Sequence, residues 1–328
     1  MILNILFLIG GLALILFGAN WLTDGASAVA RRLGVSDLII GLTIVALGTS
    51  APELAISIIS AVDGNAPLAI GNVVGSNIFN ILVIIGIVAM LKPIVITRSV
   101  MTTEIPLVTV SALVLLTMGC STILDGAPER LVTRVDGILL LIMFGLFLRY
   151  MFATARSSQP TAAEADPAAL QAAEKSRGGT LKATAGIVGG LVALVFGGDK
   201  FVDGASGLAS AMGVSDAVIG LTIVAAGTSL PELATSIVAA RKGENGMAIG
   251  NVIGSCIFNI LLILGTAATI TPLPFGGIST IDLLVMTGAS VMFWVFGWFF
   301  RERTITRVEG ALMVLSYVGY TAWLIASL

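Results

Sequence analysis

Ten long apolar segments run along the chain, and short polar stretches separate them. Each segment is close to the length of about 20 residues that a helix needs to cross the hydrocarbon core of a membrane. Apolar runs of this length predict membrane-spanning helices. The predicted spans are residues 2–22, 38–61, 67–90, 100–119, 135–153, 183–202, 217–240, 246–271, 279–299 and 308–327.

The composition indicates an all-α integral membrane protein whose surroundings are a lipid bilayer. The chain is 57% hydrophobic and only 11% charged, whereas soluble domains are about 25% charged. Histidine is absent, which excludes zinc sites, catalytic triads and proton relays that need imidazole. The two cysteines form no disulfide or metal-binding pattern. No basic patch suggests nucleic acid, and the sequence indicates neither a bound cofactor nor an obligate protein partner.

The two halves of the chain are copies of each other. The segment GLTIVALGTSAPELAISI from Gly41 returns as GLTIVAAGTSLPELATSI from Gly220, and GNVVGSNIFNIL from Gly71 returns as GNVIGSCIFNIL from Gly250. All of these matches share an offset of 179 residues. The predicted units are a first five-helix repeat at 1–154 with its motif region at 41–86, a cytoplasmic linker at 155–182, and a second repeat at 183–328 with its motif region at 220–265.

An odd number of spans in each repeat predicts that the second repeat is inverted relative to the first, giving ten transmembrane helices as two inverted five-helix repeats. With the N-terminus outside, 14 of the 17 Lys and Arg residues lie in inside loops, and only Arg130, Arg134 and Lys200 lie at outside ends. Cytoplasmic loops carry such an excess of positive charge. We therefore expect both termini on the periplasmic side of a bacterial inner membrane. Inverted repeats that meet at the membrane centre are typical of secondary transporters.

Each motif region carries one glutamate in the middle of an apolar run, in GTSAPE at 48–53 and in GTSLPE at 227–232. A charge at the bilayer centre costs about 2.5–3.5 kcal/mol on insertion scales, so intramembrane carboxylates usually have a function. The proline before each glutamate removes a helix hydrogen bond, which predicts a kink and carbonyls near 46–48 that are free to face a ligand. The structural alternative is a kinked helix whose glutamate is bonded by neighbouring hydroxyls. Because the pattern occurs twice, we predict that Glu53 and Glu232 meet at the membrane midplane and bind a cation.

The next span of each repeat carries a second polar pattern. Polar residues recur every four positions, and so share one helix face: Asn72, Ser76 and Asn80 in the first repeat, and Asn251, Ser255 and Asn259 in the second. Asn72 and Asn251 are equally well explained as ligands or as residues that hydrogen-bond neighbouring helices, whereas the four deeper residues are better ligand candidates. Carboxylate, hydroxyl, amide and carbonyl oxygens are hard donors, which suit Na⁺ or Ca²⁺.

With these paired motifs, the chain resembles the cation/Ca²⁺ exchanger superfamily, and most closely its prokaryotic sodium/calcium exchangers. The resemblance covers both motif regions and the ten-span layout. It implies exchange of Ca²⁺ for Na⁺ by alternating access. The ligands that it implies are the carboxylates of Glu53 and Glu232, the side chains of Thr49, Ser50, Ser76, Asn80, Thr228, Ser229, Ser255 and Asn259, and the carbonyls of Ala46 and Ala225. Potassium-dependent members carry Asp where this chain has Asn259, so K⁺ dependence is not expected.

We therefore expect a Na⁺/Ca²⁺ antiporter and not an enzyme. Exchange of Ca²⁺ for H⁺ is an alternative, because burial can raise the pKa of a glutamate until it carries protons. Exchange of another cation for Na⁺ and a cation channel lined by the two glutamates are further alternatives. Anionic substrates fit poorly, because no Lys or Arg falls near the middle of a predicted span.

Overall fold

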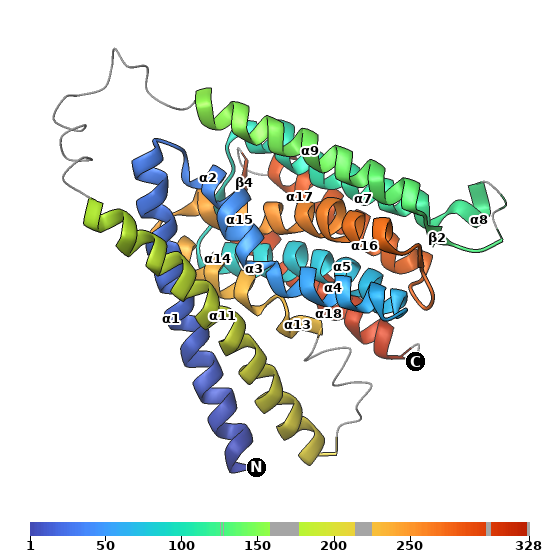
Figure 1. Ribbon diagram of the computed structural model, residues 1–328, viewed down its shortest axis with the longest axis horizontal. Coiled ribbons are helices and arrows are strands. Elements are labelled where there is room, and N and C mark those ends of the chain that lie inside the picture. The colour runs from blue at the N-terminus through green and yellow to red at the C-terminus, as the bar shows by residue number, and fades with distance from the viewer. Residues whose placement is uncertain (125, 127, 158–176, 214–224, 300–302, 327–328) are drawn as a thin grey trace.

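The computed structural model describes all residues except 125, 127, 158–176, 214–224, 300–302 and 327–328. Its elements are almost entirely helical (Figure 1). The first half contains α1 (Ile2–Leu33), α2 (Asp37–Ile40), η1 (Gly41–Val45), α3 (Ala46–Thr49), α4 (Ala51–Val62), α5 (Ala66–Phe79), η2 (Asn80–Ile85), α6 (Gly86–Leu91), β1 (Ile94–Val95), η3 (Val100–Glu104), α7 (Ile105–Gly119), α8 (Ser121–Leu124), β2 (Leu131–Val132) and α9 (Arg134–Ser157), where η denotes a π-helix. The second half contains α11 (Arg177–Ala211), α13 (Ala225–Gly227), α14 (Leu230–Lys242), α15 (Asn245–Ile257), η5 (Phe258–Leu264), α16 (Gly265–Ile270), β3 (Leu273–Pro274), α17 (Thr280–Phe299), β4 (Thr304–Ile305) and α18 (Arg307–Ala326).

Within the described residues, 8 helices are long and apolar enough to cross a membrane, and a bent pair at Asp37–Thr49 and Ala51–Val62 makes up to 9. These helices fall on nine of the ten predicted spans. The tenth prediction, at 217–240, lies partly outside the described residues, and its described part contains α13 and α14.

The first helix is longer than the sequence pattern predicted. The apolar run ends near residue 22, but α1 continues to Leu33 and stops at Gly34, whose φ of 63° is left-handed. Its 32 residues span about 48 Å at 1.5 Å per residue, well beyond the hydrocarbon core of about 30 Å. The sequence-based prediction ended the helix where the hydrophobic residues end. The helical hydrogen bonds continue beyond that point until Gly34 caps the helix.

Helices α1 and α11 pack side by side as an antiparallel pair (Figure 1). Glycines every seventh residue bring the two backbones together: Gly11, Gly18 and Gly25 on α1, and Gly190, Gly197 and Gly204 on α11. A Cβ atom at Gly18 would lie 2.8 Å from the Gly190 carbonyl oxygen, and one at Gly190 would lie 2.6 Å from the Leu22 nitrogen. Small residues allow this close approach, which drives helix association in membranes.

Two short antiparallel ribbons join the halves of the chain reciprocally. In one ribbon β1 pairs with β4, and in the other β2 pairs with β3. The repeat offset relates β1 to β3, while β2 and β4 are the corresponding segments near the ends of the two repeats. Each ribbon therefore contains one strand from each half, and the two halves exchange strands in the same way.

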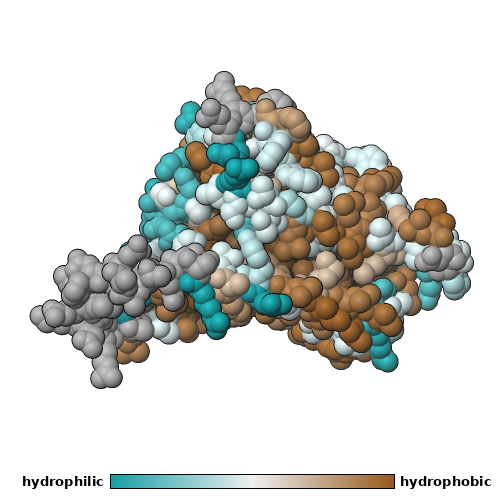
Figure 2. Space-filling view, turned by 90° about the horizontal axis from the view of Figure 1, so that it is seen from above, coloured by the Kyte–Doolittle hydropathy of each residue, from teal (hydrophilic) through white to brown (hydrophobic). Residues whose placement is uncertain are grey.

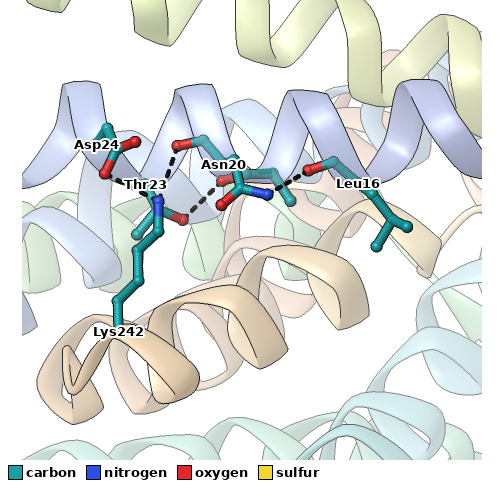
Figure 3. A network of polar contacts seen from close by, with 6 residues as sticks. Leu16, Asn20, Thr23, Asp24 and Lys242 are labelled. Atoms are coloured by element: carbon teal, nitrogen blue, oxygen red, sulfur yellow. Dashed lines mark hydrogen bonds and ion pairs between the residues drawn. The ribbon is translucent and has the colours of Figure 1, made fainter.

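A further polar contact links α14 to α1, as Figure 3 shows. The Lys242 ammonium lies 2.8 Å from the Asp24 carboxylate and also donates to the Asn20 carbonyl at 3.4 Å. Asn20 and Thr23 turn their side chains back to carbonyls of their own helix, at Leu16 and Ala19. The end of α14 is thereby attached to the long helix α1.

Broad hydrophobic areas lie on the surface, and hydrophilic residues gather on other parts of the same face (Figure 2). Exposed apolar side chains are numerous on α9, among them Leu139, Ile142 and Leu146. The segments α5–α6 and α15–α16 are instead almost fully buried. This arrangement fits a lipid-facing belt around an inner pair of helices, with the second polar pattern of each repeat in the protein interior.

Candidate cation site

Both glutamates follow a break in a helix. In the first repeat α3 ends at Thr49, α4 begins at Ala51, and the helix axis bends by 48° between them. Pro52 lies in the first turn of α4, a position at which the backbone N–H has no partner within the same helix. In the second repeat α14 begins at Leu230, with Pro231 in its first turn. The predicted proline kink is confirmed in the first repeat, while in the second repeat the residues before α13 lie outside the described part of the chain.

Glu53 and Glu232 lie in the first turns of α4 and α14, and each is only 1% exposed. The Ser50 hydroxyl donates to Glu232 Oε1 at 2.9 Å, and the Ser229 hydroxyl donates to Glu53 Oε1 at 3.5 Å. Each carboxylate is thus bonded by the serine at the helix break of the other repeat. The two broken helices therefore meet at their breaks, and each half of the chain supplies a hydroxyl that bonds the carboxylate of the other half.

Five buried oxygens of the predicted site residues have no hydrogen-bond partner, and two of the five belong to the carboxylates themselves. They are Glu53 Oε2, Glu232 Oε2, Ser76 Oγ, Asn80 Oδ1 and Asn259 Oδ1. An unsatisfied buried polar group costs about 1–3 kcal/mol, and a charged one costs more. Because such groups are rare in folded proteins, these five oxygens are candidates for coordinating a bound cation. These oxygens come from four segments, α4, α14, α5–η2 and α15–η5.

Asn72 and Asn251, whose role the sequence left open, bond neighbouring helices in the same way. Asn72 donates to the Glu53 carbonyl at 3.3 Å and to the Ser57 hydroxyl at 3.1 Å. Asn251 donates to the Glu232 carbonyl at 3.2 Å and to the Ser236 hydroxyl at 3.0 Å. Both amides hydrogen-bond the glutamate-bearing helix to the next span. These bonds hold the backbone that carries each glutamate in place.

The other predicted site residues are placed as follows. Thr49 is fully buried and donates to Asn251 Oδ1 at 3.1 Å. The Ser255 hydroxyl donates to Glu232 Oε1 at 3.5 Å. Half-buried Thr228 lines a cavity of about 240 Å³ that also contacts Pro52, Pro231 and Asp199. Ala225 opens α13, and its side chain lies outside the described residues.

The Ala46 carbonyl is not free, contrary to the sequence-based expectation. It accepts the Ser50 N–H at 3.0 Å and the Thr49 hydroxyl at 3.4 Å. The reason is that a proline withholds its N–H from the carbonyl four residues earlier, which for Pro52 is Gly48. The helical bond from Ser50 to Ala46 survives, so Ala46 can offer a ligand only its remaining acceptor capacity.

Two neighbours of the site were not singled out from the sequence. Asn77 accepts a hydrogen bond from Asn259 at 3.5 Å, and Cys256 is its counterpart in the second repeat. Both follow the serine of the polar pattern and are 1% exposed. The π-helices η2 and η5, which contain Asn80 and Asn259, were also unexpected. Single π-turns are frequent at functional sites, but no local residue pattern announced them.

The donor set determines which ions the arrangement suits. Among the described residues, no group of three or more His, Cys, Asp or Glu side chains gathers as a metal cluster. The cluster instead combines two carboxylates with hydroxyl and amide oxygens. Such hard oxygen donors bind Na⁺ and Ca²⁺ well and transition metals poorly.

Comparison with known proteins gives consistent results. The family described as sodium/calcium exchanger protein matches residues 3–153 and 182–326. CaxA of Alkalimonas amylolytica is 40% identical over 100% of both chains, and the inner membrane protein YrbG of Escherichia coli is 36% identical over 99% of this chain and 96% of its own. A solved structure of the sodium-calcium exchanger NCX_Mj, soaked with Na⁺ and Sr²⁺, matches with a TM-score of 0.81 at 30% identity and covers 98% of each chain.

These matches span nearly the whole chain, and they agree with the helical membrane fold and the paired motifs of the two halves. The family consists of transporters that exchange cations. The chain belongs to the sodium/calcium exchanger family, in the prokaryotic branch of the cation/Ca²⁺ exchanger superfamily.

Proposed function

We propose that this protein is a secondary antiporter that moves Ca²⁺ in exchange for Na⁺ at a midplane site between Glu53 and Glu232. The supporting observation is the reciprocal pair of serine–glutamate bonds beside five buried oxygens without partners. One Ca²⁺ balances the charge of two carboxylates, and two or more Na⁺ can replace it. Because Ca²⁺ and Na⁺ need the same oxygens, binding of one ion excludes binding of the other, as exchange requires.

The proposed ligands are those that the sequence suggested. Glu53 and Glu232 provide the charge, and the hard oxygens around them complete the coordination. The remaining proposed ligands are the side chains of Thr49, Ser50, Ser76, Asn80, Thr228, Ser229, Ser255 and Asn259 and the carbonyls of Ala46 and Ala225.

We further propose ten spans in two inverted repeats, 1–154 and 183–328, joined by a cytoplasmic linker at 155–182. The reciprocal ribbons, the reciprocal serine–glutamate bonds and the matching helix breaks support a two-fold relation between the repeats. Transporters with inverted repeats bind their substrates at the repeat interface and alternate access around it. The positive-inside bias supports periplasmic termini in a bacterial inner membrane.

The cavity beside Thr228 supports an access path to this site from the outer face. It lies between α4, α11 and the break before α14, and exposed Asp199 lies among its lining residues. The excess of Lys and Arg residues in the loops on the opposite side of the membrane places this end of α11 outside.

Replacing either glutamate by glutamine tests the proposal. Glu53→Gln or Glu232→Gln removes half of the site's negative charge with little change in shape, so Na⁺-gradient-driven ⁴⁵Ca²⁺ uptake into proteoliposomes is expected to disappear. Exposed Glu129 provides a matched control, and Glu129→Gln should transport like the parent protein. Uptake at the parental rate in both site variants contradicts the proposal.

Exchange of Ca²⁺ for H⁺ is distinguished in the same vesicles by the driving gradient. Uptake under a pH gradient in the absence of Na⁺ favours H⁺ coupling, and uptake only with an outwardly directed Na⁺ gradient favours Na⁺ coupling. Ca²⁺ flux that needs neither gradient, beyond its own, indicates a channel. A parallel K⁺ gradient tests K⁺ dependence. We do not expect K⁺ dependence, because this chain has Asn259 where potassium-dependent members carry Asp.

A further inference from the structure

The residues that line the cavity beside Thr228 are packed differently in their two copies. Ile56 and Thr228 line the cavity and are half-buried. The repeat offset of 179 residues relates these two positions to Thr235 and Thr49. Both of these threonines are 0% exposed. One set of repeat-related positions is therefore hollow on one side of the candidate site and tightly closed on the other.

The closed side buries a polar group that has no partner. The Thr235 hydroxyl lies one turn after Glu232 on α14 and has no hydrogen bond. Its counterpart, Ile56, carries no polar atom on its side chain. Burial of an unsatisfied hydroxyl is unfavourable, so other contacts have to offset the cost of closing this side.

One such contact joins two helices across the closed side. Lys242, the last residue of α14, lies 2.8 Å from the Asp24 carboxylate on α1 and donates to the Asn20 carbonyl at 3.4 Å (Figure 3). Asn20 is the repeat counterpart of Asp199, which lines the cavity on the opposite side. Lys242 therefore attaches α14 to α1 at the position where the other side has its cavity.

The corresponding residues on the cavity side have the wrong charges for such an attachment. Lys242 corresponds to Asp63 at the end of α4, and Asp24 corresponds to Asp203 on α11. Both of these counterparts are exposed, and Asp203 pairs with Lys200 of its own helix at 2.8 Å. Two carboxylates repel each other. The chain thus encodes an attraction between helices on one side of the site and a repulsion at the matching place on the other.

We propose that the ion pair between Lys242 and Asp24 is a latch that holds the inner side of the cation site closed and favours the state that opens outward. A contact made in only one of two states shifts their equilibrium toward that state. When the site opens inward, Lys242 releases Asp24 and the Thr235 hydroxyl meets water. This inference rests on the proposed function, because it requires a site that opens alternately to the two sides of the membrane.

The accessibility of position 235 from the cytoplasmic side tests the latch. In full-length protein with Cys120→Ser and Cys256→Ser, the substitution Thr235→Cys supplies the single thiol. A membrane-impermeant methanethiosulfonate is added to inside-out vesicles, and the labelling rate is measured. Lys242→Met should raise this rate about two- to fivefold, the range expected for loss of an exposed ion pair. Arg241→Met removes the neighbouring exposed charge, and as the matched control it should leave the rate unchanged.

A charge exchange distinguishes the latch from a general loosening of the structure. Asp24→Lys together with Lys242→Asp restores an ion pair of opposite sense and should return the labelling rate to that of the parent. Either reversal alone places like charges together and should label faster than the parent. A monodisperse elution profile of each variant verifies folding. A Lys242→Met rate equal to that of the parent, or an exchange that labels as fast as the single reversals, overturns the proposal.

A latch added to the outer side gives the converse test. Asp63→Lys places a cation opposite Asp203 and so copies the inner pair. It should slow the labelling of Ile56→Cys from the outside about two- to fivefold and speed the labelling of Thr235→Cys from the inside. Unchanged rates at both positions contradict the charge asymmetry.

The labelling rates are independent of transport, which separates the two proposals. If the parent protein shows no Na⁺-driven Ca²⁺ uptake, the proposed function fails whatever the labelling rates are. If uptake is present and the labelling of Thr235→Cys does not depend on Lys242, only the latch is overturned.

Discussion

At the scale of single residues, the serine hydroxyls hold the two carboxylates in unequal ways. The Ser50 hydroxyl lies 2.9 Å from Glu232 Oε1, while the Ser229 hydroxyl lies 3.5 Å from Glu53 Oε1. Hydrogen bonds to charged groups contribute about 1.5–3 kcal/mol, and short ones are the stronger. The two glutamates are therefore related by the repeat but are not equivalent in their surroundings.

We predict that Ser50→Ala impairs cation binding more than Ser229→Ala. Removing the shorter bond should raise the Ca²⁺ concentration for half-maximal uptake about tenfold or more, in keeping with a lost charge-assisted bond. Concentration series of ⁴⁵Ca²⁺ uptake measure this value. Ser316→Ala, on α18 and bonded only to its own helix, is the control. Equal or reversed effects of the two site variants contradict the prediction.

The sequence singled out the residues of the candidate site, but it did not predict their contacts. The glutamates, their hydroxyls and the deeper amides were identifiable because carboxylates and amides stand out in an apolar run. The contacts that join Ser50 to Glu232 and Thr49 to Asn251 cross between the repeats. No local pattern specifies such pairs, and Asn77 and Cys256 were overlooked for the same reason.

At the scale of elements, hydropathy located the spans but not all of their ends. Helix α1 continues through polar residues to Gly34, and α11 begins at Arg177 and ends at Ala211. Hydropathy reports where the membrane is, whereas helix ends depend on caps and packing. The π-helices depend on tertiary packing, which single-residue propensities do not contain.

The glycine contact between α1 and α11 predicts a sharp contrast between neighbouring residues. Gly190→Ala places a Cβ atom 2.6 Å from the Leu22 nitrogen, whereas the nearest atom to a Cβ at Gly189 is 3.9 Å away. Overpacking costs about 1–3 kcal/mol, so Gly190→Ala should lower the melting temperature in detergent. Gly189→Ala should leave it unchanged. Similar melting temperatures for the two variants contradict the close backbone contact.

The ion pair between Asp24 and Lys242 is expected to contribute little to stability. The Asp24 side chain is 70% exposed, and exposed ion pairs contribute about 0–1 kcal/mol. A double-mutant cycle with Asp24→Asn and Lys242→Met measures the coupling energy from denaturation in detergent. A coupling above about 2 kcal/mol would show that the attachment of α14 to α1 is far stronger than that of surface pairs.

At the scale of the whole molecule, the proposed inverted arrangement makes a topological prediction. An alkaline phosphatase fused after Leu328 should be active, because this enzyme folds only outside the cytoplasm, and a fusion within 155–182 should be inactive. A green fluorescent protein fused at the same two points should give the opposite pattern. Activity of both phosphatase fusions, or of neither, contradicts two repeats of opposite orientation.

Each two-stranded ribbon pairs a strand from the first half with one from the second half, so the ribbons cannot form until late in synthesis. Strands β1 and β2 have left the ribosome long before Leu273 and Thr304, the first residues of their partners, are translated. A chain cut short after the first repeat would keep both strand edges unsatisfied, a hazard for association with foreign strands. Each ribbon therefore closes only once the second repeat has been synthesised, because each half supplies the missing strand of the other.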